Sequence, residues 1–281
     1  MSPFANIAPN VNGHFKLIYY AAVLRLMRRV IEAAGSQERA FELFPFLSGY
    51  HDQLCRFAGH QSELPTDARW QQALSAWEAA IEDHLPLRAL RDVAALTYDQ
   101  LVDWMVIGLV EADGRFGVLF ETLQGIGGQV RPTLGLFITW SGDAVYSSIR
   151  RLARLGLIVI HNESAPRPEW VLQFSPGLWD ALHTDATGYQ GRRVNLIDAD
   201  QSRSLERLPL SPELAERARG TAALLQNGEL PAVIIRGIQN NGRRRVLGAM
   251  AKAMGRSLLV IEAPPPSQDR LWVELGPLST A

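Results

Sequence analysis

The sequence predicts a multi-domain protein of mixed class, in which an all-helical N-terminal region precedes an α/β module. Three patterns lead to this prediction. Residues 14–92 carry apolar residues at helical spacing, residues 96–185 place helices before two β-rich runs, and residues 231–262 run strand, loop, helix and strand. With 281 residues, the chain is long enough for two or three domains.

Residues 1–92 are expected to form a helical N-terminal region. Apolar residues recur there at intervals of three and four along two stretches. They are Leu17, Tyr20, Leu24, Met27 and Ile31 in the first stretch, and Trp70, Leu74, Trp77 and Ile81 in the second. The polar and small residues of "AAGSQ" and "HQSELPTD" separate the helices.

Residues 93–185 are expected to form a winged helix, in which helices are followed by a two-stranded hairpin. Thr97 can cap a helix through "YDQLVDWMVIGLVEAD", "RFGVLFETL" is a second helix, and Pro132 stands where a third would open. Asp143 can cap a fourth helix, "AVYSSIRRLARL", which Gly156 ends. The β-rich runs "LIVIH" and "EWVLQF" then flank the loop "NESAPRP".

Residues 186–220 are expected to be a linker, because they mix polar residues with glycine and proline. Within this segment, Ser211 can cap a short helix that has Pro212 at its first position. The run "VNLIDAD" (194–200) also lies here, ahead of the α/β module.

Residues 221–281 are expected to hold the start of an α/β module of the phosphate-loop (P-loop) type. "AVIIR" (232–236) and "SLLVIEA" (257–263) are almost wholly apolar, as parallel strands buried on both faces are. Between them, an apolar stripe marks a helix that ends at Gly255. The stripe consists of Val246, Leu247, Met250, Ala251 and Met254.

The loop of this module has the G-x-x-x-x-G spacing with which backbone N–H groups and a helix N-terminus cradle phosphate. Its candidate ligand-binding residues are Gly237, Asn240, Asn241, Gly242, Arg243 and Arg244. The two asparagines tolerate left-handed backbone angles, so the loop can curve without further glycines. Each arginine at 243–245 is unfavourable at the positive end of the helix dipole by about 0.3 to 1 kcal/mol unless an anion is bound. A site for ATP or ADP is one prediction, and solvent-screened arginines without a ligand are the alternative.

Hydrolysis of a nucleotide by this chain alone is not expected. A phosphate loop carries Lys and then Ser or Thr after its second glycine, to contact the phosphates and Mg²⁺. Arg243 supplies charge in place of the lysine, but Arg244 has only donors and cannot coordinate a cation, so no intact Mg²⁺ site is predicted. An apolar strand that ends in Asp-Glu is also missing after the loop.

Two segments in this order resemble the AAA-family ATPases that carry an N-terminal winged-helix domain. The first combines "DGRFGVLFETLQG...RPTLGLF" (113–137) with "SSIRRLARLGLIV" (147–159), and the second is the "GxxxxGRR" loop of a degenerate first ATPase module. The resemblance covers about residues 95–281. It implies that Gly237, Gly242, Arg243 and Arg244 occupy the phosphate-loop positions. An intact second ATPase module, usual in that family, is not part of these 281 residues.

The resemblance implies the regulatory or scaffolding part of an AAA-type ATPase. Some relatives are encoded with contractile injection systems, which implies remodelling or assembly of protein complexes. The expected partner is another protein or the rest of an AAA assembly, and a homo-oligomer stays open. Two parallel strands with one or two helices cannot cover both faces of a sheet, so we expect a fragment of a longer protein or a chain that a partner completes.

A winged-helix regulator that binds nucleic acid is the alternative function. Arg150, Arg151 and Arg154 could reach phosphates or bases in the major groove of DNA. Acidic residues surround them in the sequence, and the chain has a formal net charge of -1, so DNA is the less favoured partner. The acidic residues are Asp143, Glu163, Glu169 and Asp180.

Other classes of protein fit the sequence poorly. His51, Cys55 and His60 lie close together, but their spacing fits no usual zinc pattern, so no metal site is predicted. The chain has no nucleophile elbow and no G-x-G-x-x-G after a strand, which argues against a metabolic enzyme. A single cysteine forms no disulfide within the chain, and the apolar run "LIYYAAVL" is too short to span a membrane. We therefore expect a cytoplasmic protein without a membrane partner.

Overall fold

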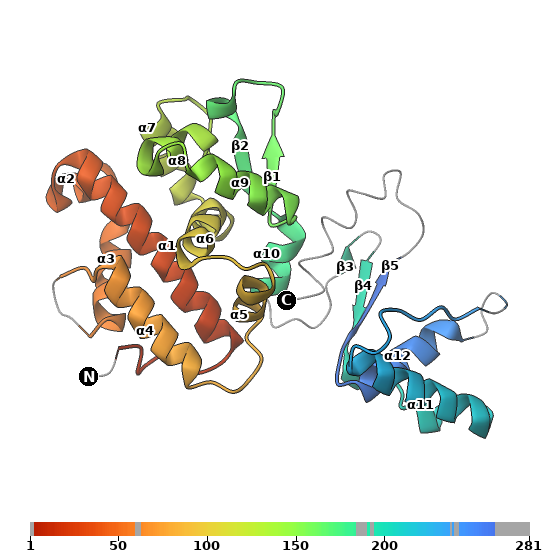
Figure 1. The fold of residues 1–281 in the computed structure, drawn as a ribbon. Coiled ribbons are helices and arrows are strands. Elements are labelled where there is room, and N and C mark those ends of the chain that lie inside the picture. Colours follow the sequence, from red (N-terminus) through yellow and green to blue (C-terminus); the bar gives the residue numbers. More distant parts are fainter. Residues whose placement is uncertain are drawn as a thin grey trace. The chain divides into compact units, whose positions relative to one another are not determined.

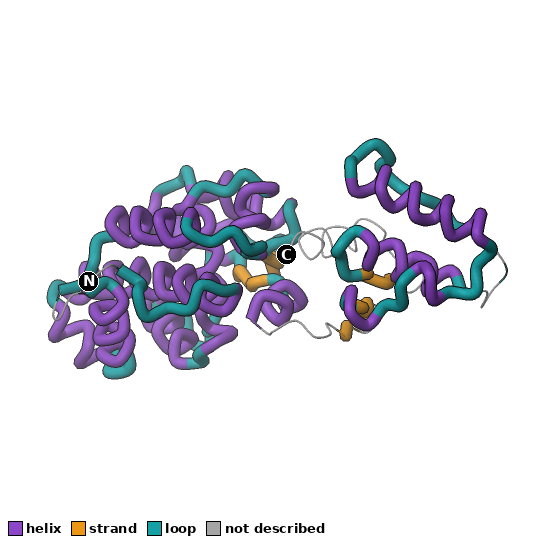
Figure 2. Tube along the Cα trace, turned by 90° about the horizontal axis from the view of Figure 1, so that it is seen from below, coloured by secondary structure: helices purple, strands orange, loops and turns teal. Residues whose placement is uncertain are grey.

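The computed structural model describes residues 3–59, 63–183, 190–191, 194–236, 238 and 242–261. These residues form two compact units, the first up to residue 183 and the second from residue 190 onward (Figure 1). Helices predominate in both units, and each unit adds one small antiparallel sheet (Figure 2). The described chain is therefore an α+β protein that is mostly helical.

The first unit is built around α1 (Val11–Ala34), the longest described helix. The ends of α1 follow from its sequence. The Asn10 side chain accepts a hydrogen bond from the Gly13 N–H, and Gly35 takes a left-handed φ of 84°. Four shorter helices follow, so the helices expected in residues 14–92 are present. These are α2 (Gln37–Leu43), α3 (Leu47–Phe57), α4 (Asp67–Ala79) and α5 (Pro86–Val93).

Helix α6 (Tyr98–Ala112) packs along α1 (Figure 1). It starts as the sequence predicts, because the Thr97 side chain and Gln100 form a capping box. Leu24 of α1 and Trp104 of α6 are both fully buried in the same apolar cluster. Residues 1–92 and 93–183 therefore share one core, which differs from the expectation of two separate domains.

The predicted hairpin is confirmed. Strands β1 (Ile158–His161) and β2 (Val171–Phe174) pair antiparallel, with Ile158 opposite Phe174. The short 3₁₀ helix η1 (Arg167–Glu169) lies in their connection, and Gly156 takes the expected left-handed φ just before β1. The helices around the hairpin are α7 (Arg115–Gln124), α8 (Leu134–Ser141), α9 (Val145–Arg154) and α10 (Pro176–His183).

Two helix starts differ from the prediction. The Thr133 side chain caps α8, so Pro132 lies ahead of that helix and not at its first position. Helix α9 begins after Ala144 and has no side-chain cap. The backbone carbonyl of Asp143 accepts from the Tyr146 N–H in a tight turn, and this turn takes the place of the predicted side-chain cap.

In its described residues, the second unit contains two α-helices and a three-stranded sheet. The Ser211 side chain caps α11 (Pro212–Gln226), with Pro212 at its first position as predicted. Helix α11 packs against α12 (Arg243–Ala253), and their contact forms a small core that includes Ala222 and Met250. The remaining elements are β3 (Gln190–Gly191), β4 (Val194–Ile197), β5 (Leu258–Ile261) and the 3₁₀ helices η2 (Ala199–Gln201) and η3 (Leu205–Arg207).

The prediction of two parallel strands on either side of α12 is wrong. Strand β5 pairs antiparallel with β4, with Ile197 opposite Leu258, and β4 comes from the segment 186–220 that the sequence suggests is a linker. The run "AVIIR" (232–236) forms no strand, and Ile234 is 79% exposed. An apolar, β-branched run forms a strand only where a neighbouring strand pairs with it, and β4 supplies the described partner of β5.

A membrane-spanning helix is not found in the described part of the chain.

Candidate functional site

The predicted phosphate loop is described only at its C-terminal end. Gly237, Asn240 and Asn241 lie outside the described residues. Gly242 directly precedes α12 and has a φ of 84°, a left-handed conformation that glycine adopts without strain. Arg243 and Arg244 form the start of α12.

The first turn of α12 is strongly basic. Arg243, Arg244 and Arg245 follow one another, and the turn contains no acidic residue. The Arg245 and Val246 N–H groups both donate to the Gly242 carbonyl, so Gly242 closes the turn. The positive end of the helix dipole and three guanidinium groups therefore lie together, which favours a bound anion.

A hollow of about 1350 Å³ opens beside this turn. Its basic lining consists of Arg203, Arg243, Arg244 and Arg245, and none of the described residues that line it is acidic. Its apolar lining includes Ile197, Leu208, Ile235, Leu258 and Leu259. Binding sites for small molecules are usually apolar clefts with a few convergent polar groups, and this hollow has that composition.

Arg203 is the residue of this hollow that the sequence does not reveal. It lies between η2 and η3, 34 residues before Gly237 at the start of the loop, in the segment expected to be a linker. No spacing rule connects it with the G-x-x-x-x-G motif. Only the packing of the η2–η3 segment against α12 brings Arg203 to the same hollow as the loop arginines.

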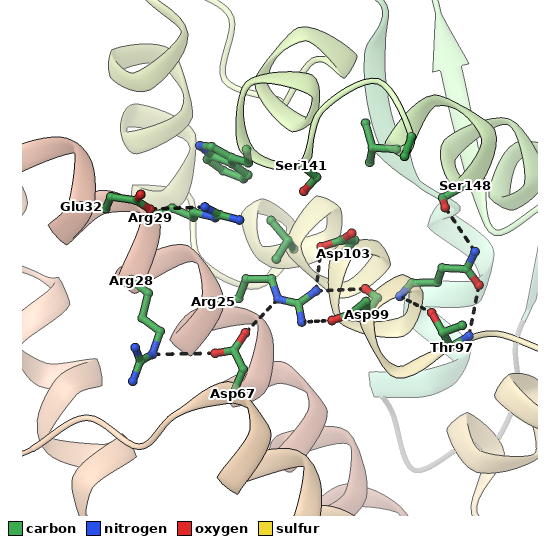
Figure 3. A pocket seen from close by; sticks show the side chains of 15 residues that line it. Arg25, Arg28, Arg29, Glu32, Asp67, Thr97, Asp99, Asp103, Ser141 and Ser148 are labelled. Atoms are coloured by element: carbon green, nitrogen blue, oxygen red, sulfur yellow. Dashed lines mark hydrogen bonds and ion pairs between the residues drawn. The ribbon is translucent and has the colours of Figure 1, made fainter.

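A second hollow, of about 550 Å³, lies in the first unit between α1, the start of α6 and the turn between α8 and α9. Figure 3 shows the Arg25 side chain of this hollow among three carboxylates. The Arg25 guanidinium donates to Asp67 (3.2 Å), Asp103 (2.9 Å) and Asp99 (2.5 Å), and it also donates to the Asp99 carbonyl. Arg25 therefore ties α1 to the starts of α4 and α6.

The Arg25 cluster carries more negative than positive charge. Burial raises the pKa of Asp103, and this effect and the nearby charge of Asp99 together outweigh the attraction of Arg25. The Oδ1 atom of Asp67 is buried without a hydrogen-bond partner, although Arg28 Nε forms an ion pair with it at 3.8 Å. Four of the five N–H groups of Arg25 already donate within the protein, so this cluster links helices rather than binding a ligand.

The arginines considered for DNA contact, Arg150, Arg151 and Arg154, all contact other residues of the first unit. Arg151 Nη2 donates to the Ala94 carbonyl at 2.8 Å and so holds α9 to the end of α5. Arg150 lies 3.4 Å from Glu163 and 5.6 Å from the centre of the Trp170 ring. Arg154 is exposed on α9 and donates to the Arg150 carbonyl at 3.4 Å. These internal contacts leave less basic surface on α9 than its sequence suggests.

The described residues hold no group of three or more His, Cys, Asp or Glu side chains arranged to bind a metal ion. His51 Nε2 lies 3.8 Å from the Cys55 sulfur, within α3, and His60 is outside the described residues.

Comparison with known proteins adds no relative. No protein-family model, no curated protein and no solved structure matches the chain. The geometry of the hollow beside α12 is therefore the main support for a functional proposal.

Proposed function

We propose that this chain is a regulatory or scaffolding part of an AAA-type ATPase assembly, and that it binds the phosphates of a nucleotide without hydrolysing it. The observation that carries the proposal is the hollow beside α12. Gly242 opens the helix in a left-handed conformation, and four arginines line the hollow without an acidic residue among its described lining. Guanidinium groups and a helix N-terminus are both well suited to phosphate.

The residue at position 244 supports binding without turnover. The hydroxyl that normally holds Mg²⁺ in a phosphate loop is replaced by Arg244, which has no acceptor atom. No general base is found among the described residues that line the hollow, since the polar lining beside the arginines is Gln201 and Ser202. A nucleotide held there would therefore act as a structural or regulatory ligand.

The first unit supplies the scaffolding part of the proposal. Helices α8 and α9, followed by the β1–β2 hairpin, have the order of a winged helix, and in this proposal they contact a protein partner. DNA is the less favoured partner, because Arg150 forms an ion pair with Glu163 and Arg151 donates to the Ala94 carbonyl within the unit. In a duplex DNA titration at low salt we expect no salt-dependent complex. A complex that Arg154→Ala abolishes would favour the nucleic-acid alternative.

Nucleotide binding can be tested with fluorescent ATP and a phosphate-release assay. We expect saturable binding and no steady release of phosphate. Gly242→Val should weaken binding, because a β-branched residue is strained at a φ of 84°. Gly228→Val is the matched control, since Gly228 has a φ of 74° in the same unit but is not among the residues lining the hollow. Absence of binding, or turnover that Gly242→Val abolishes, would contradict the proposal.

A further inference from the structure

We infer that the hollow beside α12 selects a metal-free polyphosphate chain, and that Arg203 is a further ligand of that chain. This inference rests on the proposed nucleotide binding and deepens it. Polyphosphate is the chemistry shared by free ATP and by inorganic tripolyphosphate, so the experiment below tests both sources.

The segment that carries Arg203 is fixed against α12 at two points. The Lys252 ammonium group of α12 donates to the Ser202 carbonyl at 2.9 Å. One turn earlier on α12, Gly248 lets the Ser202 side chain come so close that a Cβ added at Gly248 would lie 2.9 Å from its Oγ. Both contacts involve the residue next to Arg203. They place Arg203 at the hollow from an element that is separate from the loop.

The lining of the hollow has the charge that a metal-free polyphosphate needs. The lining is basic, with Arg203, Arg243 and Arg245 beside Arg244, and none of the described lining residues is acidic. Free ATP carries about four negative charges at neutral pH, whereas the Mg²⁺ complex carries about two, because the metal ion neutralises the phosphate oxygens that it bridges. Charge complementarity therefore favours the ligand without the metal.

The geometry of the ligand oxygens leads to the same preference. Guanidinium groups bind phosphate oxygens through pairs of parallel N–H donors. An oxygen that coordinates Mg²⁺ is less available to such a donor pair. By motif spacing, Arg244 takes the position of the metal-holding hydroxyl. Arg203 adds a donor group from the other segment. In this inference, arginines take the place of the metal ion.

Competition and direct titration on the full chain test the inference. We expect tripolyphosphate and ATP with EDTA to bind, inorganic phosphate to bind far more weakly, and excess Mg²⁺ to weaken ATP binding by about 10-fold or more. Arg203→Ala should weaken the binding of both polyphosphates by about 10-fold or more, as expected for the loss of a charged hydrogen-bonding group. Arg219→Ala is the control, since Arg219 is exposed on α11 and pairs with Glu206.

A second variant separates the paired donors of Arg203 from its charge. Arg203→Lys keeps the positive charge but loses the parallel N–H donors of the guanidinium group, so binding of both polyphosphates should weaken while circular dichroism shows a folded protein. The inference is overturned if Mg²⁺ leaves the ATP affinity unchanged or raises it, or if Arg203→Ala binds ATP and tripolyphosphate with unchanged affinity. Either result leaves the proposed nucleotide binding intact. If neither ATP nor tripolyphosphate binds, both proposals are wrong.

Discussion

Glu78 is the most deeply buried acidic residue in the described part of the chain, and its two partners explain why it is tolerated. The His14 ring, itself buried, donates from Nε2 to one carboxylate oxygen at 2.7 Å. Arg91 Nη1 approaches both carboxylate oxygens, at 3.0 and 2.8 Å. The trio joins α1, α4 and α5, so a buried carboxylate on α4 is held by residues of two other helices.

Removal of the Glu78 charge should destabilise the first unit. Glu78→Gln removes the buried carboxylate that Arg91 Nη1 contacts and leaves Arg91 only its exposed neighbour Asp92 as an ion-pair partner. Breaking one side of a buried ion pair costs about 3 to 5 kcal/mol of unfolding free energy. Urea unfolding followed by tryptophan fluorescence measures the loss. Glu82→Gln, which changes an exposed glutamate just beyond α4, should alter stability by less than about 0.5 kcal/mol. Equal effects of the two substitutions would show that the trio contributes little.

The same trio predicts how stability depends on pH. Burial raises the pKa of Glu78, but the hydrogen bonds from His14 and Arg91 outweigh it, so the pKa lies below its usual range. A carboxyl group whose pKa is lower in the folded state stabilises the protein above its unfolded pKa, and this contribution is lost as the pH falls through the folded value. The stability advantage over Glu78→Gln should therefore be full near pH 7 and shrink below about pH 4. An advantage that grows on acidification would contradict this assignment.

At the scale of elements, α6 meets the hairpin and α10 at a position where only glycine fits. A Cβ added at Gly108 would lie 2.6 Å from the Trp179 ring and 2.7 Å from the Phe174 ring. Both rings are buried, and Phe174 also stacks on Trp104 of α6 at 4.4 Å between ring centres. The absence of a side chain at Gly108 thus sets how closely α6 approaches β2 and α10.

Gly108→Ala should lower the stability of the first unit even though alanine favours helix more than glycine does. Overpacking a tight core costs about 1 to 3 kcal/mol, which exceeds the roughly 1 kcal/mol gained from helix propensity. Gly49→Ala is the matched control, because Gly49 lies in α3 of the same unit and an added Cβ there meets nothing within 4 Å. Chemical unfolding of both variants checks the prediction. It would be contradicted if Gly108→Ala were as stable as Gly49→Ala.

The elements that the sequence predicts well are those with local causes. The caps at Thr97 and Ser211 depend on residues within a few positions of one another, and the hairpin at 158–174 joins two runs that follow one another directly along the chain. The pairing of β4 with β5 joins segments about 60 residues apart, and nothing in either run specifies the other. The run at 232–236 has the composition of a buried strand, yet strand formation requires a neighbour that composition does not reveal.

The candidate site likewise combines residues that the sequence predicts with one that only long-range packing brings in. Gly242, Arg243 and Arg244 follow from motif spacing, and the structure places all three at the start of α12. Arg203 joins them only through the contacts of Ser202 with Gly248 and Lys252. The hydrogen bond from Arg151 to the Ala94 carbonyl joins residues 57 positions apart. It makes Arg151 less available for the DNA contact that the sequence suggests. Long-range packing thus adds one basic residue to the hollow and takes one from the surface of α9.

At the scale of the whole molecule, the described residues contain two apolar cores that share no residue. The first core includes Leu24, Trp104 and Phe174, and the second, much smaller core includes Ala222 and Met250. A small core buries less apolar surface and supplies less stabilisation, so the second unit should be the less stable of the two. The proposed ligand would add to its stability by mass action.

Separate cores predict separate unfolding transitions. Met250→Ala should destabilise the second unit by about 2 to 5 kcal/mol, because it empties a buried position, and should leave the first unit unchanged. The described tryptophans all lie in the first unit, so the Trp-detected transition should stay in place while the helical signal at 222 nm acquires an earlier loss. Combining Met250→Ala with Glu78→Gln should give additive losses, since the two sites share no partner. A Trp-detected transition that Met250→Ala shifts as far as the helical signal would mean that the two cores unfold as one cooperative unit.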